Sequence, residues 1–407
     1  MKKKKVSRIL FLSLVAILPL NLGKHFEFYG SYVYGNLIDY LVPTLYLQDV
    51  LAVALLISMI FEKKKFGLSG PVKKLAWFLL VLFASSIFAS RALPSFWFLF
   101  RVFLYSLTAV YAYRWFDFKK DAVIFHKILT MQFIFISTLA ILQFLFKGSV
   151  FDNYLFFGEQ PYSFSTPNIT KEIFLGNVVL PPMALFRHPN ILAGYLAVLL
   201  ILTIFWIPKN RIGVLSMYLG SLALLMTFSY FTWFVLFWVL LLYKTLPNKK
   251  HLMYLSLLGA SLILLIPFFP FSSDNASFYR RDNLLGASYR VAGEFPLLGV
   301  GVNNFTSYVD DFQVTDDIRF TQPVHNVFAL ILAESGIFAF FIFILVFFEM
   351  YSGVYKKSCI PLFVILSVIL LLMSFDHYFW TMHQTLLLLF MIMGFSWRAA
   401  YGQRKER

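Results

Sequence analysis

The sequence has 407 residues, of which 60% are hydrophobic and only 14% are charged, and its mean hydropathy is +0.75. Soluble domains average about 25% charged residues, so this composition excludes a soluble protein and indicates a polytopic membrane protein. One cysteine, Cys359, excludes a disulfide scaffold and thiol-pair redox chemistry. The formal charge of +15 comes mostly from short basic clusters between apolar runs, which favours membrane orientation over nucleic acid binding as its cause.

Apolar runs of about 20 residues are long enough to cross the hydrocarbon core of a bilayer. The first run follows Lys2 to Lys5 as a signal peptide would, but Asn21-Leu22-Gly23 offers no small-residue cleavage site, so we expect a retained helix. The chain is then a single all-α membrane domain, residues 1–407, with about twelve transmembrane helices. They are predicted near 9–22, 44–61, 75–90, 95–113, 122–146, 189–207, 212–228, 230–243, 251–268, 325–349, 359–376 and 379–397.

The basic residues are divided unequally between the two sides of this twelve-helix arrangement. On the side of the termini lie 24 of them, the other side has 9, and Arg101 and Lys127 fall within helices. The positive-inside rule therefore predicts that both termini are cytoplasmic. Two outward loops, 147–187 and 269–323, are long, and loops of that length are usually functional. We therefore expect the chemistry on the outer face.

Metal-binding and nucleotide-binding motifs are missing from the sequence. The seven histidines are scattered, and no HExxH, CxxC, Walker or GxGxxG run is present. The sequence therefore predicts neither a metal site nor a nucleotide cofactor.

Three segments place polar groups at the outer membrane boundary. They are Phe186-Arg187-His188-Pro189-Asn190; Arg281 followed by Pro296-Leu297-Leu298-Gly299-Val300-Gly301-Val302-Asn303-Asn304-Phe305; and His325-Asn326 followed by Glu334-Ser335-Gly336. In this order they resemble the O-antigen ligase and O-antigen polymerase superfamily of bacterial membrane glycosyltransferases. The resemblance covers residues 186–336, and the helix count and large outward loops agree with it.

The resemblance implies transfer of a glycan from an undecaprenyl diphosphate carrier to an acceptor hydroxyl, on a lipid or on another glycan. The reaction takes place on the outer face of the bacterial inner membrane and needs no metal or other cofactor. A ligase, a polymerase and a protein O-oligosaccharyltransferase of the same superfamily remain open. A lipid or sugar transporter is an alternative of another class, but it would need polar sites at the bilayer midplane. A structural scaffold would need no convergence of these residues.

Arginine suits a diphosphate because its planar guanidinium binds phosphate oxygens bidentately and stays charged. Arg187 and Arg281 match the family clusters, and Arg290 is an additional candidate for the donor diphosphate; the alternatives are a headgroup contact for Arg187 and an ion pair with Glu294 for Arg290. Many relatives carry Ser-Arg where this chain has Ser229-Tyr230, so contacts from that helix end are in doubt, and Arg290 is a candidate to compensate.

His325 matches the family's functional histidine, and its imidazole can accept a proton from a sugar hydroxyl near neutral pH. Asn326 is expected to orient this ring or to cap a helix. His188 and Asn190 are supporting candidates, with Pro189 favouring a helix entry at His188.

A carboxylate inside a membrane helix is costly unless it is paired. Glu334, about 13 Å deeper than His325 along a helix, is expected to form a buried hydrogen-bonded hinge with Gly336. We also expect Asp49 to pair with Arg101.

Overall fold

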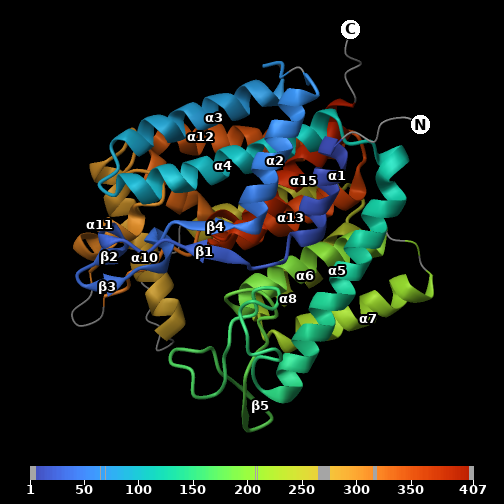
Figure 1. Cartoon of the computed structure of the whole chain (residues 1–407), viewed down its shortest axis with the longest axis horizontal. Coiled ribbons are helices and arrows are strands. Elements are labelled where there is room, and N and C mark those ends of the chain that lie inside the picture. The colour runs from blue at the N-terminus through green and yellow to red at the C-terminus, as the bar shows by residue number, and fades with distance from the viewer. Residues whose placement is uncertain are drawn as a thin grey trace.

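The computed structural model describes residues 6–64, 66–68, 70–206, 208, 210–264, 276–314 and 319–402, and these residues are mostly helical (Figure 1). The helices are α1 (Val6–Ile17), α2 (Leu47–Phe61), α3 (Pro71–Ile87), α4 (Ala92–Arg114), α5 (Phe118–Phe146), α6 (Pro189–Phe205), α7 (Arg211–Met226), α8 (Tyr230–Thr245), α9 (Lys250–Leu264), α10 (Ala276–Glu294), α11 (Phe305–Phe312), α12 (Val327–Lys356), α13 (Ile360–Phe375), α14 (Tyr378–Thr381) and α15 (His383–Tyr401).

A helix occupies each of the twelve ranges predicted as membrane crossings, although residue 207 of one range and residues 265–268 of another lie outside the described residues. Within the described part of the chain, three helices are both long and apolar enough to cross a membrane: α4, α5 and α12. The helical architecture is therefore confirmed, and the number of crossings stays a prediction.

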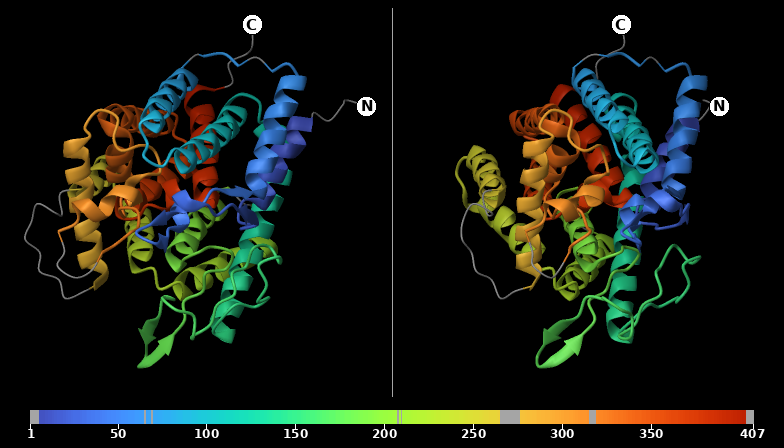
Figure 2. Two further views of the ribbon diagram at one scale, coloured as in Figure 1. Left: turned by 60° about the vertical axis from the view of Figure 1, so that its left-hand side comes forward. Right: turned by 90° about the vertical axis from the view of Figure 1, so that its left-hand side faces the viewer.

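Short antiparallel strands occur in the connecting segments, which the all-α prediction did not include. Their pairs are β1 (Gly23–His25) with β4 (Thr44–Tyr46), β2 (Tyr32–Val33) with β3 (Asn36–Leu37), and β5 (Glu172–Phe174) with β6 (Asn177–Val179). The β5–β6 hairpin belongs to the predicted loop 147–187 and projects from one end of the bundle, opposite the connection between α2 and α3 (Figure 2). The predicted loop 269–323 contains α10 and α11.

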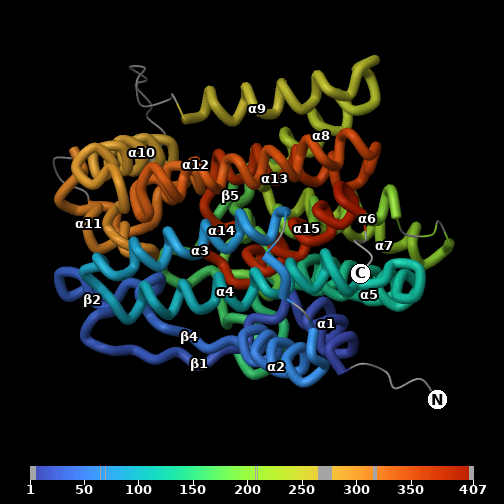
Figure 3. Tube along the Cα trace, turned by 90° about the horizontal axis from the view of Figure 1, so that it is seen from above, coloured from blue at the N-terminus to red at the C-terminus, as the bar shows by residue number. Residues whose placement is uncertain are grey.

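The centre of the bundle is formed by α6, α13 and α15. Their apolar side chains are buried around almost the whole helix, as expected of helices without a solvent-facing stripe. In Figure 3, α13 and α15 lie in the middle of the molecule, with α9 along one edge and α2 along the opposite edge. The C-terminal end of α13 is therefore held by surrounding helices, which matters because the candidate site begins there.

A buried ion pair joins α2 to α4, as the sequence predicted. The Arg101 guanidinium lies 3.0 Å from Oδ2 of Asp49, and the Tyr105 hydroxyl donates a hydrogen bond to Oδ1 at 2.8 Å. The same carboxylate accepts the backbone N–H of Tyr46 at 3.0 Å. This network satisfies charges that would otherwise be costly to bury.

The loop segment 296–301 lies across an interruption in α12. Gly336 has φ +73° and ψ −176°, outside helical values, and a Cβ there would approach Leu297 O to 2.1 Å. The loop forms three hydrogen bonds with α12: Val300 N to Ala333 O at 3.1 Å, Gly301 N to Glu334 O at 2.9 Å and Ile337 N to Pro296 O at 2.8 Å. The glycines of this motif thus permit a close backbone approach that fixes the segment between α10 and α11 on α12.

Candidate active site

The start of α12 and the end of α13 are joined by Asn326, the residue before α12. Its side-chain oxygen accepts the Ala329 N–H at 3.0 Å and so caps the helix, while its amide donates to Ser374 O at 2.6 Å. Asn326 therefore fixes the start of one helix against the end of the other. Of the two roles expected for it, the structure assigns the capping role.

This junction brings His325 and Asp376 together across 51 residues of sequence. His325 Nδ1 lies 3.3 Å from Oδ1 of Asp376, and both side chains are mostly buried, with 13% and 12% of their surface exposed. The Nε2 atom of His325 is also buried, and it has no hydrogen-bond partner among the described residues. A carboxylate on Nδ1 favours the tautomer with a proton on that nitrogen, which leaves Nε2 able to accept another.

His377 completes a compact cluster of ionisable groups. Its backbone N–H donates to Asp376 Oδ1 at 2.8 Å, its ring centroid lies 5.0 Å from that of His325, and its Nδ1 lies 2.7 Å from the Thr381 hydroxyl. Tyr40 meets the His377 ring edge-on at 5.6 Å. Donor atoms of His325, Asp376 and His377 lie within 4.8 Å of one another, so this geometry is compatible with a metal ion, although the sequence showed no such spacing.

Arg281 reaches this cluster from α10. Its guanidinium donates to Phe375 O at 2.5 Å, lies over the Phe375 ring at 4.4 Å, and is 3.9 Å from Asp376 Oδ2. These contacts hold the guanidinium beside the last turn of α13. A second cation on Asp376 would face the repulsion of this arginine, which disfavours a metal ion there.

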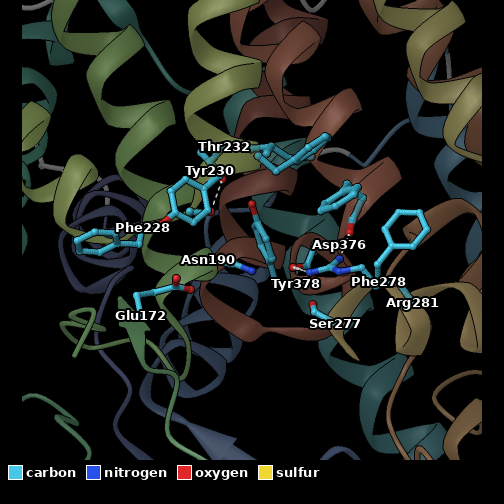
Figure 4. Close-up of a pocket in the computed structure, with 14 residues that line it drawn as sticks. Glu172, Asn190, Phe228, Tyr230, Thr232, Ser277, Phe278, Arg281, Asp376 and Tyr378 are labelled. Atoms are coloured by element: carbon cyan, nitrogen blue, oxygen red, sulfur yellow. Dashed lines mark hydrogen bonds and ion pairs between the residues drawn. The ribbon is translucent and has the colours of Figure 1, made fainter. Parts of the chain in front are cut away.

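Arg281 and Asp376 line a cavity of about 670 Å³, which lies within the range of about 300–1,000 Å³ usual for small-molecule sites. Aromatic rings and short polar side chains supply most of the wall: Glu172, Asn190, Phe228, Ser229, Tyr230, Phe231, Thr232, Ser277, Phe278, Arg281, Leu372, Phe375, Asp376 and Tyr378. Figure 4 shows Arg281 and Asp376 on one side of the cavity and Glu172 on the other, with Asn190 and Tyr378 between them.

Burial and charge act in opposite directions on these ionisable groups. Burial lowers the pKa of His325, and the neighbouring Asp376 carboxylate offsets part of this decrease. Burial alone would raise the pKa of Asp376, but the hydrogen bond and charge of His325 and the charge of Arg281 hold it well below its usual range. Near neutral pH the cluster thus contains a neutral His325 imidazole beside an ionised Asp376, the state required of a general base.

The residues of the first family cluster, 186–190, do not all face the same surroundings. Arg187 Nη2 lies 3.1 Å from His25 Nε2 and its Nη1 is 3.6 Å from Asp39, so its guanidinium faces the segment that precedes α2. That region encloses a separate cavity of only about 50 Å³. Arg187 and Arg281 therefore line different cavities, and the structure does not place both guanidinium groups on one ligand.

The next residues of that cluster face the candidate site. His188 caps α6 by accepting the Asn190 N–H at 3.1 Å, and its Nε2 lies 3.1 Å from the Thr170 hydroxyl. Burial lowers the pKa of His188 to about 4, with Asp376 opposing and His325 adding to the decrease. His188 is thus neutral near pH 7, and Asn190 lines the large cavity.

Arg290 and Glu334 are engaged elsewhere. Arg290 is exposed and donates a hydrogen bond of 2.7 Å to Phe312 O at the end of α11. It is not among the residues that line the large cavity, whereas Tyr230 is. Glu334 is buried and accepts the Phe305 N–H at 3.2 Å, which anchors the start of α11 beside the α12 interruption at Gly336. Neither residue lies where it contacts the His325 imidazole.

Sequence reasoning did not select Asp376, His377 or Glu172. A signal for Asp376-His377 was present, because these two polar residues stand where the apolar run 359–376 ends, just before the run 379–397, at the predicted outer boundary. Glu172 had no comparable signal, since only the folded hairpin carries it to the cavity.

The fold and the site define a mostly helical protein with apolar helices able to cross a membrane and an acid–imidazole–guanidinium cluster at the ends of α10, α12 and α13. A family model described as O-antigen ligase matches residues 189–344. This match supports the assignment of the chain to the O-antigen ligase superfamily and a function of the general ligase or polymerase type. No curated protein matches the chain. Asp376 and His377 lie outside the matched region.

Proposed function

We propose that this protein transfers a glycan from an undecaprenyl diphosphate carrier to an acceptor hydroxyl on the outer face of the bacterial inner membrane. The observation that carries the proposal is the convergence of His325, Asp376 and Arg281 beside a large cavity, with two of these residues inside the region matched as O-antigen ligase. Convergence at one end of the bundle favours a transferase over a transporter, which would need polar sites along a path through the bilayer.

In the proposed reaction, Arg281 binds the diphosphate of the donor in the large cavity. A guanidinium is a suitable cation for this leaving group, because the phosphate oxygens gain negative charge as the glycosidic bond breaks. Arg281 already forms part of the cavity wall and keeps N–H groups beyond those used on Phe375. Arg187 stays a second candidate, acting from the separate small cavity.

His325 then acts as the general base. Its unpartnered Nε2 accepts the proton of the attacking acceptor hydroxyl, while Asp376 holds the ring through Nδ1 and stabilises the imidazolium that forms. The acceptor oxygen forms the new bond to the anomeric carbon as the carrier diphosphate departs from the opposite side. The expected result is inversion of anomeric configuration without participation of a metal ion.

The test is a reconstituted reaction with purified protein, a carrier-linked oligosaccharide and separate candidate acceptors. A lengthened glycan still attached to its carrier identifies a polymerase, transfer to a second lipid identifies a ligase, and transfer to a hydroxyl-bearing peptide identifies a protein oligosaccharyltransferase. Loss of the lipid diphosphate donor without a glycosylated product, or no consumption of it, would contradict the proposal.

A further inference from the structure

The charged groups in the large cavity are distributed unevenly. Arg281 pairs with Asp376 at one side, whereas Glu172 of the β5–β6 hairpin lies at the opposite side (Figure 4). Glu172 and Tyr230, at the start of α8, both line the cavity, and no ion pair within the described part of the chain involves Glu172. The cavity therefore has one end where a guanidinium and a carboxylate balance each other and an opposite end where the Glu172 carboxylate has no countercharge among the described residues.

This polarity gives a bound donor one favourable direction. Resting on the function proposed above, the diphosphate lies at Arg281, and the glycan extends toward the hairpin that projects from the bundle (Figure 2). Asn190 lies between the two ends, and Ser229 and Ser277 also line the cavity, so amide and hydroxyl groups that can bind sugar hydroxyls are available (Figure 4). The cavity volume of about 670 Å³ accommodates a diphosphate with the first sugar attached to it.

We propose that Glu172 determines which sugars the enzyme accepts next to the diphosphate: neutral or amino sugars are used and carboxylated sugars are rejected. A carboxylate accepts hydrogen bonds from sugar hydroxyl groups and binds a protonated amine still more strongly. A uronic acid would place a second negative charge near Glu172, in a partly dehydrated cavity where like charges repel more than in water. Rejection by such an uncompensated charge is a common source of specificity.

The experiment compares transfer from three short-chain polyprenyl diphosphate donors that carry an N-acetylhexosamine, a 2-amino-hexose or a hexuronic acid. The acceptor is kept constant, and kcat/KM is measured for each donor. Wild-type protein is expected to prefer the two uncharged or basic sugars over the uronic acid by about tenfold or more, the factor that corresponds to about 1.4 kcal/mol.

Four variants separate charge from other effects. Glu172→Gln keeps the size and hydrogen bonding but removes the charge, so the discrimination should fall to within about threefold, and Glu172→Lys should reverse it. Tyr230→Phe keeps the carboxylate and should keep the preference. Glu294→Lys changes the same kind of charge on the exposed end of α10, outside the cavity, and should leave the preference unchanged.

Equal use of all three donors by the wild-type protein, or an unchanged preference in Glu172→Gln, would overturn the role of Glu172 while leaving the proposed transferase function intact. Absence of transfer from every lipid diphosphate donor by the wild-type protein would overturn the proposed function and this inference together. Size-exclusion chromatography in detergent verifies that each variant is folded, and Glu172→Gln keeps the test valid if Glu172→Lys does not fold.

Discussion

At the scale of single residues, Arg281 lines the large cavity, and its guanidinium lies 3.9 Å from Asp376 Oδ2. Arg281→Lys keeps the charge but loses the planar set of donors, so kcat/KM for the lipid diphosphate donor should fall by about tenfold, and Arg281→Ala should lower it by about 10- to 100-fold more. Arg319→Lys, which alters an exposed arginine paired with Asp310, is the matched control. If Arg281→Lys has wild-type kinetics, the proposal that Arg281 binds the donor diphosphate is wrong.

The fall of kcat/KM at acid pH should report the protonation of His325. Because burial lowers its pKa below the ordinary value of 6.5, kcat/KM should rise with pH with a midpoint below pH 6.5. Asp376→Asn removes the carboxylate that partly raises this pKa, so the midpoint should move to lower pH, while the plateau rate falls because the imidazole is no longer oriented. Asp152→Asn, in the first outward loop, should change neither quantity. A midpoint that moves to higher pH in Asp376→Asn would contradict this arrangement.

The residues that sequence reasoning predicted and those it missed differ in how they reach the site. His325 and Arg281 could be found because each follows a recognisable motif at a predicted membrane boundary. Asp376 contacts His325 only because α12 and α13 end side by side, and nothing local in the sequence specifies that pairing. Arg187 and His188 are adjacent in sequence, yet their side chains face different surroundings, a divergence that depends on where the segment before α2 lies.

At the scale of elements, the interruption of α12 can be tested through Gly336. Gly336→Ala places a side chain at φ +73° and close to Leu297 O, so it should cost about 1–3 kcal/mol from backbone strain, with a further loss from the clash. We expect a lower Tm in detergent and reduced glycan transfer, because the loop that carries α11 is displaced.

Gly293→Ala is the matched control for this substitution. Gly293 lies in α10, and a Cβ there would meet no atom within 4 Å, so the change should leave Tm equal or slightly raise it. Equal thermal stability of Gly336→Ala and Gly293→Ala would show that the interruption of α12 does not require glycine.

Apolar runs predicted the helices well because burial or insertion in lipid requires continuous hydrophobic sequence, whereas the short strands were missed. The pairs β1–β4 and β5–β6 have only three residues per strand, too short for a period-two pattern to be recognised. The segment from Pro296 to Gly301 was recognised as part of a family motif, and its hydrogen bonds to α12 became apparent only in the fold.

At the scale of the whole molecule, the basic residues predict the orientation in the membrane, because the twelve-helix arrangement would place 24 of them on the side of the termini and 9 on the other. Single cysteines in a Cys359→Ser background test it. With an impermeant thiol reagent on spheroplasts, Ser165→Cys in the first outward loop should be labelled, and Lys119→Cys before α5 should be labelled only after permeabilisation; both positions are exposed.

Ser273, Thr315 and Ser69 were obvious positions from the sequence for this labelling, but they lie outside the described residues. Labelling of Lys119→Cys without labelling of Ser165→Cys on intact spheroplasts would reverse the orientation. It would then place the large cavity on the cytoplasmic face, where a carrier-linked glycan awaiting outward transfer is not expected.

The central claim is a base-catalysed transfer in which His325 takes the acceptor proton. The most direct measurement is the rate of glycan transfer from a lipid diphosphate donor by purified wild-type protein and by His325→Ala, each in the presence of EDTA. A positioned base contributes about 10²- to 10⁴-fold, so the account predicts full wild-type transfer in EDTA, with a loss of that size in His325→Ala while donor binding persists. Undiminished transfer by His325→Ala, or wild-type transfer abolished by EDTA and restored by a divalent metal ion at the His325, Asp376 and His377 cluster, would contradict it.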